Sequence, residues 1–90
     1  MRRKSANDIK SQKNRAPIVC LTAYTAPIAR AIDGNVDLIL VGDSLGMVLY
    51  DYENTLQVSI EQMIEHSKSV VGGTNKSCII VDMPFGTYEE

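Results

Sequence analysis

The sequence feature that most constrains the fold is an apolar run that ends abruptly in polar residues. Positions 38–41 read Leu-Ile-Leu-Val, and Gly42, Asp43 and Ser44 follow directly. Because every position of the run is apolar, it fits a parallel strand covered by helices on both faces better than a half-solvated antiparallel strand. Polar groups just past the carboxyl ends of such strands form the ligand sites of α/β folds. We therefore expect Asp43 and Ser44 at a reactive sheet edge, with capping of the next element as the alternative.

Two more apolar runs predict neighbouring strands, at positions 17–24 and 77–82. A short helix is expected after Thr25, with Ile28, Ala29 and Ile32 on one face. A longer helix should begin at the capping box formed by Ser59 and Gln62, and its predicted apolar face consists of Ile60, Met63, Ile64, Ser67 and Val71. Strands that alternate with helices indicate an α/β fold in which right-handed crossovers join parallel strands.

The chain divides into two parts by composition. Residues 1–16 are polar and are expected to form a peripheral segment with one short helix, whereas residues 17–90 carry the βαβαβ pattern. Within the second part, positions 45–58 show no helical periodicity. A connection of that length is unusual unless it binds a ligand, so we expect a substrate-proximal loop.

Charge and hydropathy exclude several classes of partner. The net charge of −2 and the isoelectric point near 5.3 give no reason to expect nucleic acid or an anionic membrane. No apolar stretch approaches the roughly 20 residues of a membrane span, and no secretory signal follows the basic start, so a cytoplasmic location is expected. Cys20 and Cys78 lie in apolar runs and are expected to be small core residues.

The carboxyl ends of two predicted strands carry aspartates, Asp43 and Asp82. Neighbouring strands lie ~4.8 Å apart, so both carboxylates can converge on one Mg²⁺ ion, although they can also be unrelated turn residues. Ser44 can donate to a substrate carboxylate or to its own loop, and Tyr24 can line the edge or simply pack. His66, the single histidine, is expected at the surface.

Four motifs together carry a resemblance to a known family. They read Leu-Thr-Ala-Tyr at 21–24, Leu-Val-Gly-Asp-Ser-Leu-Gly-Met at 40–47, Asn-Thr-Leu at 54–56 and Val-Asp-Met-Pro-Phe at 81–85. In this combination the chain closely resembles, from Ala16 to Glu90, the start of the 3-methyl-2-oxobutanoate (ketopantoate) hydroxymethyltransferases. The resemblance implies the first part of a (β/α)₈ TIM barrel, with three parallel strands and two helices besides the short amino-terminal one.

The resemblance also implies a chemistry. Asp43 and Asp82 would be the Mg²⁺ carboxylates, and Ser44 and the Asp43 backbone would contact the 2-oxo acid. In the family, Mg²⁺ binds 3-methyl-2-oxobutanoate and stabilises its enolate, which takes a one-carbon unit from 5,10-methylenetetrahydrofolate to give 2-dehydropantoate for pantothenate biosynthesis. Partners would be these two small molecules, and the complete enzyme is expected to be a homo-oligomer.

The resemblance also implies a lysine, a glutamate beside it and a later glutamate acting as general base, all on strands beyond the third, so no catalytic base can be located before Glu90. Because such a barrel needs about 250 residues, these 90 are expected to be inactive alone. Two alternatives remain open: another Mg²⁺-dependent lyase or mutase of the same enolate superfamily, and a small non-catalytic α/β binding module.

Overall fold

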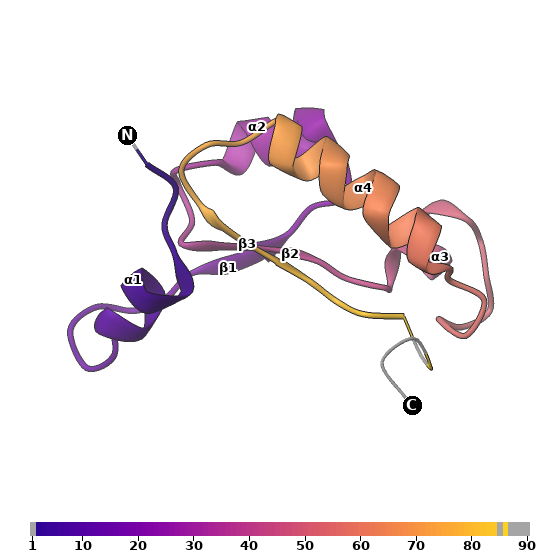
Figure 1. Ribbon diagram of the computed structural model, residues 1–90, viewed down its shortest axis with the longest axis horizontal. Coiled ribbons are helices and arrows are strands. Elements are labelled where there is room, and N and C mark those ends of the chain that lie inside the picture. The colour runs from indigo at the N-terminus through magenta and orange to yellow at the C-terminus, as the bar shows by residue number, and fades with distance from the viewer. Residues whose placement is uncertain (1, 85, 87–90) are drawn as a thin grey trace.

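A three-stranded parallel sheet forms the centre of the chain in a computed structural model that describes residues 2–84 and 86 (Figure 1). The strands β1 (Cys20–Thr22), β2 (Leu38–Val41) and β3 (Cys78–Val81) lie side by side in the order β1-β2-β3. In this register Leu21, Ile39 and Ile79 are neighbours across the sheet. The predicted α/β arrangement is confirmed, and it is consistent with part of a TIM barrel.

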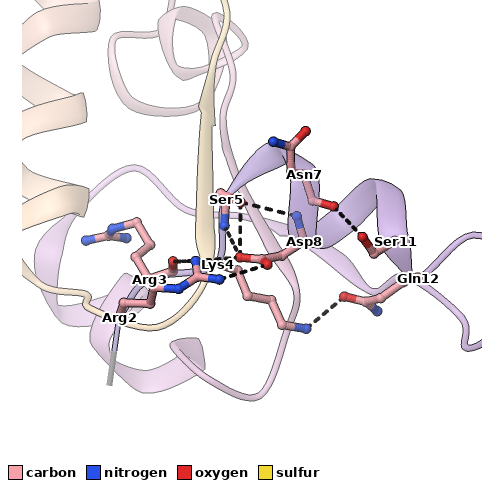
Figure 2. Close-up of polar contacts among 8 residues, drawn as sticks. All are labelled: Arg2, Arg3, Lys4, Ser5, Asn7, Asp8, Ser11 and Gln12. Atoms are coloured by element: carbon pink, nitrogen blue, oxygen red, sulfur yellow. Dashed lines mark hydrogen bonds and ion pairs between the residues drawn. The ribbon is translucent and has the colours of Figure 1, made fainter.

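Within the described residues four helices accompany the sheet: α1 (Ala6–Ser11), α2 (Ala26–Ile32), α3 (Leu45–Leu49) and α4 (Ile60–Gly72). The predicted capping box at Ser59 and Gln62 opens α4, and Gly73 ends it. Thr25 stands at the N-cap position of α2, but its side chain makes no capping hydrogen bond there. A second capping box, between Ser5 and Asp8, explains why a polar sequence forms α1 (Figure 2).

The core lies between one face of the sheet and the helices α2 and α4, which cover that face together (Figure 1). On β2, Ile39 and Val41 are fully buried, whereas Leu38 and Leu40, on the opposite face, are only half-buried. Ile80, the neighbour of Leu40 on β3, is 47% exposed. The strand is therefore apolar on both faces, yet only one face is covered by the described residues.

Three local predictions were wrong. The stretch 45–58 is not a plain loop, because α3 occupies its first residues and packs Leu45 into the core. Cys20 is exposed rather than buried, since β1 is an edge strand whose three residues are all exposed. On α2 the buried residue is Ala29, while Ile28, which we expected on the same buried face, is 56% exposed.

The amino-terminal segment contacts the sheet through Arg3 and Lys4, while its helix α1 stays largely exposed and has no buried residue. The Arg3 guanidinium donates to the Thr74 hydroxyl, the Thr74 carbonyl and the Ser77 carbonyl, each at 2.9 Å. The Lys4 ammonium forms an ion pair with Asp37, just before β2. These contacts fasten the segment to the amino-terminal ends of β2 and β3, which explains its order despite its polar composition.

Asp33, at the end of α2, stabilises the same end of the sheet. Its carboxylate accepts backbone N–H bonds from Asn75, Lys76 and Ser77 at 2.8–3.1 Å. Burial alone would raise the pKa of Asp33, but the three hydrogen bonds outweigh burial, and the pKa is lowered from its usual value. The ionised form is therefore the one that the folded state favours.

We expect Asp33→Asn to destabilise the fold by about 1–3 kcal/mol, since charge-assisted bonds are lost. Because the folded-state pKa is depressed, this contribution is present at neutral pH and disappears as pH falls through the folded-state value. Thermal unfolding midpoints at pH 7 and at acidic pH, measured in a longer protein that contains these 90 residues, check this. The exposed Asp51→Asn serves as control, and equal midpoints for both variants at pH 7 would contradict the prediction.

Candidate functional site

The carboxyl ends of the three strands bring the predicted site residues to one edge of the sheet, the end that lies toward α3 in Figure 1. Tyr24 follows β1, Asp43 and Ser44 follow β2, and Asp82 follows β3. β2 remains paired with β3 as far as Val41, which lies opposite Val81. The polar residues that follow Val41 therefore lie at this edge of the sheet.

Hydrogen bonds join these four residues in two pairs. The Tyr24 hydroxyl and the Ser44 hydroxyl lie 2.7 Å apart, and the Asp43 backbone N–H donates to Asp82 Oδ2 at 3.1 Å. If Tyr24 is the donor of the first pair, the Ser44 proton remains free for a ligand. All four side chains are partly buried, so they are shielded yet reachable.

Gly42 explains how the two pairs fit together. A Cβ atom at this position would lie 3.2 Å from Ser44 Oγ and 3.4 Å from Asp82 Oδ2. The serine hydroxyl and the aspartate carboxylate therefore both lie close to residue 42, and a side chain there would crowd them.

The donor set is compatible with Mg²⁺. No side-chain donor within residues 2–84 and 86 bonds to the Asp43 carboxylate, and Asp82 uses only one of its oxygens, toward Asp43. The same residues contain no group of three or more His, Cys, Asp or Glu side chains that could hold a metal. Mg²⁺ commonly takes one or two carboxylates and completes its shell with water or substrate oxygens. Metal binding by Asp43 and Asp82 stays a prediction.

His66 was missed as a residue of this region. It is half-buried, with Nδ1 2.7 Å from the Tyr24 carbonyl oxygen and Nε2 2.8 Å from the Tyr50 hydroxyl. One signal could have found it: His66 follows Gln62 by four residues, so both lie on one face of α4. Gln62 likewise donates to a tyrosine of the same loop, Tyr52, at 3.0 Å.

An apolar groove of about 360 Å³ runs between α4 and the end of β3. Its walls include Ile64, Val71 and Met83, and Asp82 lies at its border. The predicted apolar face of α4 therefore lines an open groove along much of its length rather than a closed core.

Comparison with known sequences decides the family. The profile of the ketopantoate hydroxymethyltransferases matches residues 3–90, nearly the whole chain. The chain belongs to the ketopantoate hydroxymethyltransferase family.

Curated relatives agree with this assignment to the ketopantoate hydroxymethyltransferase family. The chain is 56% identical over 89 residues to the 3-methyl-2-oxobutanoate hydroxymethyltransferase of Rhizobium rhizogenes. The aligned region covers 99% of the chain and 33% of that relative. It is 57% identical over 83 residues to the enzyme of that name from Paracoccus denitrificans, covering 92% of the chain and 30% of the relative. The chain thus spans about a third of the length of these relatives.

Within the described part of the chain, none of the helices has the length and apolar character needed to cross a membrane.

Proposed function

We propose that this chain supplies part of the active site of an enzyme that transfers a hydroxymethyl group from 5,10-methylenetetrahydrofolate to 3-methyl-2-oxobutanoate, giving 2-dehydropantoate. The observation that carries the proposal is the meeting of Ser44, Asp43 and Asp82 beside Gly42 at one edge of the sheet. A hydroxyl and two carboxylates suit a 2-oxo acid bound together with a divalent cation. A cytoplasmic homo-oligomer belongs to the same proposal.

Each residue of the edge has a distinct part in this proposal. Asp43 and Asp82 would hold Mg²⁺, which when bound offsets negative charge that develops on the oxygens of the 2-oxo acid. The Asp43 N–H keeps the Asp82 carboxylate turned toward β2. Ser44, oriented by the Tyr24 hydroxyl, would donate to the substrate carboxylate.

A chimera tests the proposal directly. This chain replaces the segment that it matches in the Rhizobium rhizogenes relative, and formation of 2-dehydropantoate is measured with and without Mg²⁺. We expect Mg²⁺-dependent transfer at a rate comparable to the parent. A chimera that folds like the parent but neither binds the 2-oxo acid nor turns it over would contradict the proposed function.

The 90 residues made alone should be inactive and should lack a cooperative unfolding transition. The reason is the apolar surface left open: Leu21 and Ile80 are each 47% exposed, and Met83 is 49% exposed. Size-exclusion chromatography and thermal circular dichroism check this. A soluble monomer with a sharp transition would instead support the alternative of a small non-catalytic α/β module.

A further inference from the structure

His66 connects three segments that are far apart in the sequence. From the middle of α4 its ring reaches the backbone at the end of β1, through Tyr24, and the loop after α3, through Tyr50. The Tyr50 ring meets the imidazole edge-on, with centroids 5.8 Å apart, and stacks on Tyr52 at 5.7 Å. Both ring nitrogens are thus engaged, one by a residue of the candidate site and the other by the loop after α3.

The chemistry of the two contacts fixes the tautomer of the neutral ring. A carbonyl oxygen can only accept a hydrogen bond, so the nitrogen that faces the Tyr24 carbonyl, Nδ1, must carry the proton. Nε2 of the neutral imidazole is then an acceptor, and the Tyr50 hydroxyl donates to it. Each contact therefore has one defined direction.

Tyr24 transmits the first contact to the site. Its backbone carbonyl is held by His66, while its hydroxyl is hydrogen-bonded to Ser44 at 2.7 Å. A displacement of the Tyr24 backbone would therefore move the phenol and release the serine hydroxyl. The second contact holds the start of the loop that the sequence predicts to lie near the substrate.

We propose that His66 is a positioning residue with two separable roles: Nδ1 orients Ser44 for the 2-oxo acid through Tyr24, and Nε2 anchors the loop 50–58 through Tyr50. The inference rests on the proposed function. Its first role concerns binding of the substrate carboxylate, which is the same in ground and transition states. Loss of this role should therefore raise KM for the 2-oxo acid with little change in kcat.

Three substitutions in the chimera separate the roles. His66→Asn keeps a donor near the position of Nδ1, His66→Gln keeps a polar group near the position of Nε2, and His66→Ala removes both. Glu65→Ala, at the exposed neighbouring position, controls for a change on the surface of α4. Steady-state kinetics report the first role, and hydrogen–deuterium exchange of the amides in 45–58 reports the second without requiring activity.

We expect His66→Ala and His66→Gln to raise KM for the 2-oxo acid by about 3–10-fold, the effect of one hydrogen bond, and His66→Asn to restore it. Amide exchange in 45–58 should be faster in His66→Ala and His66→Asn, but not in His66→Gln or Glu65→Ala. In a Ser44→Ala background, His66→Ala should raise KM no further, because the group that it positions is gone.

A purely structural role would give a different pattern. It would lower the thermal midpoint and the turnover of all three variants together. His66→Ala would then also raise KM further in the Ser44→Ala background. Either result would overturn the proposal, as would unchanged exchange in His66→Ala. If the unmodified chimera folded like the parent but neither bound the 2-oxo acid nor turned it over, the proposed function and the first role would fail together, and the exchange data would decide the anchoring role.

Discussion

Replacing Asp82 by asparagine should lower both Mg²⁺ affinity and the exchange of the C3 proton of 3-methyl-2-oxobutanoate by on the order of 10–100-fold or more. The substitution keeps the shape of the side chain and an oxygen that can accept the bond from the Asp43 N–H. It removes the negative charge that would face the cation, so the 2-oxo acid should be held less tightly in the form that loses its proton.

Exchange of the C3 proton is measured by NMR in deuterated water, without folate, so that proton removal is separated from one-carbon transfer. Mg²⁺ affinity is measured by calorimetry on the same chimera. Asp43→Asn should behave similarly, whereas Glu53→Gln, which removes an equal charge from an exposed loop position, should have no effect. If the C3 proton exchanged at an undiminished rate in both aspartate variants, the assignment of Asp43 and Asp82 as Mg²⁺ ligands would be wrong.

Gly46→Ala should destabilise the protein by about 1–3 kcal/mol and displace the loop 50–58. The added Cβ atom would lie 2.4 Å from Val58 Cγ2 and 3.0 Å from the Tyr52 ring. Val58 is buried and β-branched, so it cannot rotate away cheaply. The loop must therefore move as a whole, and we expect a raised KM for the 2-oxo acid together with a lower unfolding midpoint.

The same substitution at Gly72 provides the matched control. Apart from its chain neighbours and the backbone of its own helix, no heavy atom lies within 4 Å of the Cβ position there, and Gly72 is the last residue of α4. Alanine is a better helix former than glycine by roughly 0.5–1 kcal/mol, so Gly72→Ala should leave stability unchanged or raise it. Thermal unfolding of the two variants checks the contrast; equal midpoints would show that the contact of Gly46 with Val58 does not constrain the loop.

The sequence was sufficient where a local pattern had one structural solution. The run from Leu38 to Val41 is apolar at every position, which predicts a central parallel strand; β2 is central and delivers Asp43 to the sheet edge as expected, although the described residues cover only one of its faces. The capping box at Ser59 located the start of α4 correctly. In both cases the signal lies within a few residues and needs no knowledge of distant contacts.

Other features depend on partners that a local reading cannot supply. Helix α3 has five residues, too few to show a helical period, and is held by burial of Leu45. Residues 2–5 are held against the sheet by hydrogen bonds from Arg3 to Thr74 and Ser77, which lie more than 70 positions away in the sequence. His66 was placed at the surface because its tyrosine partners are brought to α4 only by the fold.

The Arg3 and Asp33 contacts lie at the amino-terminal ends of the strands, whereas the candidate site lies at their carboxyl ends (Figure 1). Groups that consolidate the fold and groups proposed to face the substrate are therefore held by opposite ends of the same sheet. For protein engineering, this separation means that an affinity tag or surface attachment ahead of Arg2 starts on the side away from the candidate site. Thermostabilising substitutions can be sought around 33–37 and 74–77 without altering the residues of the candidate site.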